Sequence, residues 1–143
     1  MRMLASIPFV LGMLFATTLL FDARATAADL PPAGKVYELR TYHASPGKLD
    51  ALQARFRDHT CKLFQKHGFE IIGFWTPTEA EEAKDTLIYI IAFPTVEAQK
   101  KAWQAFRADP EWLKVKADSE KDGSLTTKVE SKNLKATDFS PLR

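Results

Sequence analysis

The segment that most constrains the fold is an apolar run of eight residues, Thr86 to Phe93, with the sequence TLIYIIAF. Its β-branched and aromatic composition is typical of a β-strand, in which successive side chains point to opposite faces. The two sets are Leu87, Tyr89, Ile91 and Phe93 on one face, and Ile88, Ile90 and Ala92 on the other. A sheet with one face in water needs one polar set. Both faces of this strand must therefore be covered.

Strand and helix signals alternate along the chain around this segment. Further strands are predicted over residues 36–43, 69–75 and 125–133, and helices after Ser45-Pro46, over 96–108 and over 111–121. The order β-α-β-β-α-β is the ferredoxin-like arrangement of the α+β class, a four-stranded antiparallel sheet with its helices on one face. The helices cover only one face. We therefore expect the other face to pack against a second copy, which predicts a homodimer.

Three local signals place the helices. Ser45 and Pro46 suit the N-cap and first position of the first helix. Thr95 and Asp109 are predicted caps of the next two, the latter because Pro110 follows it. The predicted buried stripe of the first helix has spacings of three and four residues: Leu49, Leu52, Phe56, His59 and Leu63.

The N-terminus has the three-part layout of a secretory signal peptide. Arg2 is followed by the uncharged run Ile7 to Phe21 and then by two overlapping Ala-x-Ala sites within residues 23–27. The alternative is a retained membrane anchor, but the run is shorter than the ~20 apolar residues that span a bilayer. We expect a removed signal peptide over 1–27, an extended leader over 28–34 and a domain over 35–143. The protein would then be periplasmic or secreted, without stable membrane insertion.

The charge balance makes no case for a polyanionic partner. The 143-residue chain has 20 basic and 18 acidic residues, and removal of residues 1–27 takes away Arg2, Arg24 and Asp22. The mature chain is therefore nearly neutral, with its charges interspersed. Such a surface favours neither nucleic acid nor an acidic membrane.

One face of the first predicted strand carries the strongest candidate for chemistry. Glu38, Arg40 and Tyr42 lie two residues apart and share that face, so the carboxylate and guanidinium can pair. Facing a cavity between two sheets, they would offer an acid/base, an anion-binding group and a hydrogen-bond donor. That catalytic site requires them to point away from the helices. The alternatives are a structural ion pair and a polar patch at the dimer seam.

Other candidates are a histidine and a set of aromatic residues. His59, on the predicted apolar stripe, is either a catalytic residue or a satisfied core histidine. Trp75, Tyr89, Trp103 and Trp112 either line an aromatic-ligand site or belong to the core. No metal is expected, because His59 and His67 lack the spacing of a zinc pair, and no phosphate or dinucleotide motif indicates a cofactor.

Several segments together resemble the NIPSNAP domain over Lys35 to Arg143. They are VYELRTYHASPGKLDAL, HGFEIIGFW, FPTVEAQKKAW, ADPEWLKV and ATDFSPLR, in that order. The resemblance implies a dimeric α+β barrel, similar in fold to cofactor-independent antibiotic-biosynthesis monooxygenases. It implies no settled activity. The best-known animal members are associated with mitochondria and membrane traffic, a setting from which the predicted signal peptide departs.

Three functions are compatible with these observations. The first is a dimeric barrel that binds a small hydrophobic or aromatic molecule. The second is an enzyme on the same barrel, a cofactor-independent monooxygenase or an isomerase. The third is a structural or interaction protein whose interior is filled by its own side chains. A cavity of ligand size would separate the first two from the third.

Overall fold

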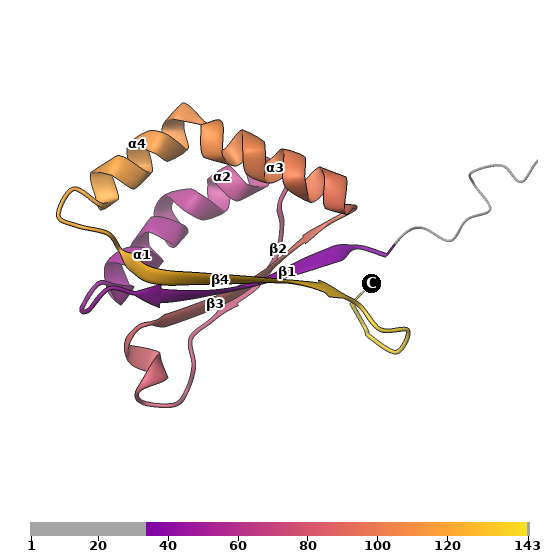
Figure 1. The fold of residues 1–143 in the computed structure, drawn as a ribbon, viewed down its shortest axis with the longest axis horizontal. Coiled ribbons are helices and arrows are strands. Elements are labelled where there is room, and N and C mark those ends of the chain that lie inside the picture. Colours follow the sequence, from indigo (N-terminus) through magenta and orange to yellow (C-terminus); the bar gives the residue numbers. More distant parts are fainter. Residues whose placement is uncertain (1–33, 143) are drawn as a thin grey trace, which may run out of the picture. The chain divides into compact units, whose positions relative to one another are not determined.

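The chain forms a four-stranded antiparallel sheet with helices α1 to α4 on one face (Figure 1). This computed structural model describes residues 34–142, so the predicted signal peptide and most of the predicted leader lie outside the described residues. The elements are β1 (Val36–Ala44), α1 (Leu49–Arg55), the π-helix η2 (Phe56–Thr60), α2 (Cys61–Lys66), β2 (Glu70–Trp75), the 3₁₀ helix η3 (Glu82–Lys84), β3 (Thr86–Phe93), α3 (Val96–Ala108), α4 (Pro110–Ser119) and β4 (Thr126–Lys135). The strand order is β2-β3-β1-β4. This confirms the predicted ferredoxin-like fold.

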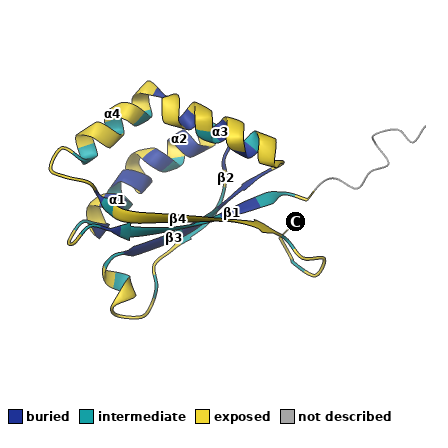
Figure 2. Ribbon diagram, viewed as in Figure 1, coloured by how far each residue is buried: buried dark blue, intermediate teal, exposed yellow. Residues whose placement is uncertain are grey.

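The core lies between the sheet and the helices. Tyr89, Ile91 and Phe93 of the central strand β3 are fully buried there, against Leu52 of α1 and Phe64 of α2. Figure 2 shows this buried layer beneath helices whose outer surfaces are exposed. The helices thus cover one apolar face of β3.

On the opposite face of the sheet, no helix of residues 34–142 lies over the strands. Ile88 and Ile90 of β3 are half-buried on this face, and Trp75 of β2 is 49% exposed. Leu134 of β4 is 38% exposed beside Tyr37 of β1. The predicted two-sided apolar character of β3 therefore leaves an apolar surface on the described chain.

Two of the three predicted helix caps are confirmed. Thr95 Oγ1 accepts a hydrogen bond from the backbone N–H of Ala98, and Asp109 Oδ1 accepts one from the N–H of Glu111. The prediction that Ser45 caps the first helix is wrong. Gly47 adopts a left-handed conformation with φ 70°, which closes a turn after β1, and α1 begins at Leu49.

The first long helix contains a π-helical insertion that changes which residues face the core. In η2 the backbone N–H of Cys61 donates to the carbonyl of Phe56, five residues earlier, so one extra residue enters the turn. Thr60 is buried with 1% exposure, and its hydroxyl donates to the carbonyl of Arg55 at 3.2 Å. His59 is exposed. The predicted placement of His59 on the buried stripe is therefore wrong.

Besides capping α4, Asp109 connects two helices through its side chain. Its Oδ2 lies 2.8 Å from Lys66 Nζ and 2.6 Å from His67 Nε2, which links the end of α2 to the start of α4. Hydrogen bonds from Lys66, His67 and the backbone of Glu111 hold the pKa of Asp109 well below its ordinary range. The carboxylate is therefore the form that stabilises the fold.

We expect Asp109→Ala to lower the thermal midpoint at pH 7 by roughly 5 °C, the usual scale for a lost cap in a domain of this size. Because the folded pKa is depressed, the contribution is complete above the unfolded pKa of about 3.9 and is lost as pH falls below it. Thermal denaturation from pH 7 to pH 2.5 should therefore show the difference from wild type shrinking. Asp118→Ala, at an exposed aspartate of α4, is the control; an equal effect of both variants would contradict the role of Asp109.

Candidate functional site

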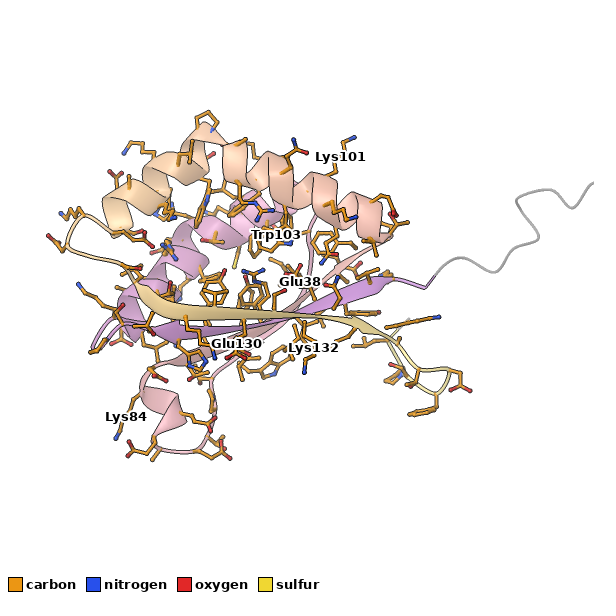
Figure 3. The ribbon with its side chains drawn as sticks, viewed as in Figure 1. Glu38, Lys84, Lys101, Trp103, Glu130 and Lys132 are labelled. Atoms are coloured by element: carbon orange, nitrogen blue, oxygen red, sulfur yellow. The ribbon has the colours of Figure 1, made fainter. Side chains whose placement is uncertain are left out.

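The polar face of β1 points toward the helices. Glu38, Arg40 and Tyr42 pair in register with Ile91, Tyr89 and Leu87, which are all buried under the helices. Figure 3 shows Glu38 between the sheet and Trp103 of α3. The predicted catalytic cavity between two sheets is therefore wrong, because its proposed polar residues lie on the other side of the sheet.

Glu38 is a buried carboxylate with four hydrogen-bond donors. Oε1 accepts from Arg40 Nη1 at 2.7 Å and from Ser131 Oγ at 2.6 Å. Oε2 accepts from Gln99 Nε2 and Trp103 Nε1, both at 2.7 Å. Burial raises the pKa of Glu38, but these hydrogen bonds outweigh it and hold the pKa below its ordinary value. Such a carboxylate joins β1, α3 and β4 and is a poor proton acceptor.

Arg40 extends this network along the strand. Its guanidinium lies over the ring of Trp103 at 4.6 Å and over that of Tyr42 at 5.4 Å, and Nη2 donates to the Tyr42 hydroxyl at 3.3 Å. Burial lowers the pKa of Arg40, but its interactions with Tyr89, Tyr42 and Glu38 raise it above the ordinary value. The charged Glu38–Arg40 pair is thus part of the packing, which favours the structural alternative for these two residues.

Tyr42 differs from its neighbours because its proton has no partner. Tyr89 is fully buried and donates to the Tyr42 hydroxyl oxygen at 3.1 Å; burial raises the pKa of Tyr89, which keeps it a neutral donor. The second donor is Arg40. A phenol oxygen has two lone pairs and one proton. With both lone pairs occupied, the Tyr42 O–H is left to donate, and it has no acceptor among residues 34–142.

Tyr42 lines a cavity of about 200 Å³ between the sheet and the helices. Its aromatic walls are Tyr42, Phe56, Phe106 and Trp112, and its other lining residues are Arg55, Thr60, Lys116, Glu120, Ser124, Thr126 and Val129. The π-helix η2 supplies Phe56 and Thr60, and π-helical turns are frequent at functional sites. An apolar cavity of about 150 Å³ holds a benzene molecule. This cavity is therefore large enough for a single substituted ring.

The sequence-predicted candidates do not meet in one place. Trp103 and Tyr89 lie behind the cavity, in the network of Glu38 and Tyr42, while Trp75 is on the open face of the sheet. His59 borders a separate groove between α1 and α4. Tyr42 and Trp112 do line the cavity.

Sequence reasoning missed Arg55, Phe56 and Phe106 as cavity residues. Phe56 was expected on the buried stripe of the first helix, but an apolar stripe does not distinguish a cavity wall from a filled core. Arg55 lies three residues after Leu52 and one before Phe56, beside that stripe. A charged residue in that position could have been recognised as partly buried.

Within residues 34–142 no cluster of three or more His, Cys, Asp or Glu side chains could hold a metal ion. No helix in the same range is long and apolar enough to cross a membrane.

We expect Glu38→Gln to reduce the free energy of unfolding by roughly 3 kcal/mol, because it leaves Arg40 without its anion and sets an NH₂ group against N–H donors. The folded pKa of Glu38 is lowered, so its contribution is present above about pH 4.3 and is lost as pH falls through the folded pKa. Urea denaturation at pH 7 and pH 3 measures both effects. Glu130→Gln, an exposed glutamate of β4, is the control. A change below about 1 kcal/mol for Glu38→Gln would mean that the network contributes little.

The comparison with solved structures finds the same fold in several bacterial proteins. Protein Atu4242 from Agrobacterium tumefaciens is 26% identical, with a TM-score of 0.66, over 76% of this chain and 99% of that chain. A second structure of the same protein describes it as a NIPSNAP family protein of unknown function. An uncharacterized NIPSNAP-like domain protein from Burkholderia xenovorans is 17% identical, with a TM-score of 0.66, over 76% of this chain and 90% of its own.

The fold is also similar to that of SnoaB, a cofactor-independent oxygenase from Streptomyces nogalater. The identity is 16% and the TM-score 0.52, over 76% of this chain and 99% of SnoaB, so the likeness concerns the fold alone. The comparison with curated proteins found no match. The NIPSNAP family model matches residues 37–141, which is nearly all of the described chain. The chain therefore belongs to the NIPSNAP family.

Proposed function

We propose that this protein binds a small aromatic molecule in the cavity between β1 and helices η2 and α4. The observation that carries the proposal is Tyr42, a lining residue of the cavity whose hydroxyl accepts from Arg40 and Tyr89 and so keeps its own proton for a further acceptor. Aromatic walls supply affinity, and one fixed donor orients a ligand oxygen; this combination is usual for small-molecule sites. The proton of Tyr42 would be donated to that oxygen.

The Glu38 network supports this role from behind the cavity. Arg40 is fixed by Glu38 Oε1 and by the face of Trp103, so its Nη2 holds the Tyr42 hydroxyl in one orientation. Side chains that contact a ligand keep their geometry better when surrounding residues hold them by hydrogen bonds. Glu38, Arg40 and Tyr89 are therefore positioning residues in this proposal.

An enzyme of the cofactor-independent oxygenase type is the second candidate function, and the fold of SnoaB favours it. The positive guanidinium of Arg40, which donates a hydrogen bond to the Tyr42 hydroxyl, would favour negative charge on a ligand oxygen bound by Tyr42, as in a phenolate or enolate. The two candidates differ in whether a bound ligand is converted. A non-catalytic interaction protein, the third alternative, needs no ligand in this cavity.

Phenol titrated into the wild-type protein should quench tryptophan fluorescence, since Trp112 lines the cavity. Tyr42→Phe should weaken phenol binding roughly five- to tenfold, the usual effect of one lost hydrogen bond, and leave toluene binding unchanged. Tyr37→Phe, on the opposite face of the same strand, is the control. Equal losses for phenol and toluene would contradict the role of the Tyr42 proton, and no binding of either would contradict the site. Mass spectrometry of the recovered phenol distinguishes binding from conversion.

The proposed assembly is a homodimer, in a periplasmic or secreted setting, in which the open sheet faces of two copies pack together. The apolar surface made by Ile88, Ile90, Trp75 and Leu134 supports this assembly, because a monomer would leave it in water. The ligand cavity lies on the helix side of each sheet, so each copy would carry its own complete site.

We expect Ile90→Asp to dissociate the dimer, because an unpaired carboxylate in an apolar interface costs several kcal/mol. Sedimentation velocity at micromolar concentration measures the change. Leu113→Asp, at a leucine of α4 that is 54% exposed on the helix side, should leave the dimer intact. A wild-type protein that sediments as a folded monomer would contradict the assembly.

A further inference from the structure

Arg55 is the most unusual charged residue in the lining of the cavity. It is the last residue of α1, directly before the π-helix, and its side chain is only 6% exposed. Arginine is almost never buried this far unless its charge and its N–H groups are paired. Its partners are therefore informative.

All hydrogen bonds of the Arg55 guanidinium come from one nitrogen. Nη1 donates to Glu120 Oε1 at 2.8 Å and to Ser119 Oγ at 3.3 Å, both at the end of α4. The guanidinium carbon also lies 5.3 Å from the ring centre of Trp112. Nε is buried and has no partner among the described residues; Nη2 makes no hydrogen bond to any of them either, but it is not fully buried. The edge of the guanidinium formed by Nε and Nη2 is thus unpaired.

That unpaired edge has a specific chemical complement. Nε–H and Nη2–H are parallel donors at the spacing of the two oxygens of a carboxylate, which they bind in a bidentate manner. A buried donor without a partner, as Nε is here, is rare in folded proteins and calls for an explanation. A ligand carboxylate would supply both acceptors at once.

The charges around the cavity agree with an anionic ligand. Arg55 and Lys116 are positive and Glu120 is negative, so the lining of the cavity carries one net positive charge. Because Glu120 already pairs with Nη1, the second positive charge is available to balance a ligand anion. The aromatic walls make a ring the natural body of such a ligand.

We infer that the ligand of the proposed site is a small aromatic carboxylate whose two oxygens bind the Nε–Nη2 edge of Arg55. This inference rests on the proposed function and names its ligand class. Arg55 then determines specificity, and Tyr42 donates to a further oxygen of the ligand. Arg55 also borders the outer groove that contains His59, but that groove lacks the aromatic walls and the Tyr42 proton. The inner cavity is therefore the site we assign.

The test compares benzoate with benzamide, a neutral molecule of the same shape, by calorimetric titration of the wild-type protein and variants. The wild type should bind benzoate at least tenfold more tightly than benzamide. Arg55→Lys, which keeps the charge but removes the bidentate edge, should weaken benzoate about tenfold and leave benzamide unchanged. Arg57→Met, two residues further along in η2 and exposed, should leave both affinities unchanged.

Glu120→Gln provides a second measurement that leaves Arg55 in place. It removes the internal anion that shares the guanidinium, so benzoate should bind more tightly and benzamide as before. Benzamide bound as tightly as benzoate, or a benzoate affinity that neither Arg55→Lys nor Glu120→Gln changes, would overturn the inference and leave the proposed function standing. Failure of benzoate, benzamide and phenol alike to bind would overturn the proposed function itself.

Discussion

The buried carboxylate of Glu38 is the interaction on which the rest of the structure depends. Its two oxygens receive donors from β1, α3 and β4, so one side chain fixes the sheet, its edge strand β4 and helix α3 relative to one another. A buried charge is tolerated only when it is fully hydrogen-bonded, and here each oxygen has two donors. The same bonds fix Arg40, and through it the hydroxyl of Tyr42. The arrangement of the polar side chains behind the cavity therefore depends on the Glu38 carboxylate.

Much of the fold could be predicted from the sequence because its signals are local. The apolar run of β3, the alternation in β1 and the caps at Thr95 and Asp109 each follow from a few neighbouring residues. The side of the sheet to which the polar face of β1 points could not be predicted from neighbouring residues. An Arg–Glu pair is typical of a surface in contact with solvent or of a cavity lining. Here the pair can be buried because three residues distant in sequence, Gln99, Trp103 and Ser131, donate hydrogen bonds to Glu38.

The π-helix limited the prediction of the site in a different way. A helical stripe assumes a constant 3.6 residues per turn, and one inserted residue moves every later position round the axis by about 100°. His59 thereby moves out and Thr60 moves in. No residue type in the segment FRDHT is specific to a π-helical turn. The sequence therefore predicted the helix correctly but placed His59 on its buried side, which is wrong.

Arg40, which is partly buried, and Arg55, which is buried, show why ligand recognition is assigned to one arginine and not the other. Arg40 bonds Glu38 through Nη1 and Tyr42 through Nη2, and aromatic rings lie against its guanidinium, so Nε is its one nitrogen without a hydrogen bond. Arg55 bonds only through Nη1, and its whole second edge is unpaired beside an aromatic cavity. A single nitrogen without a partner can be tolerated under a ring, whereas two adjacent nitrogens without partners match a carboxylate. Sequence alone favoured Arg40 because it lies beside Glu38, and that same pairing is what occupies it.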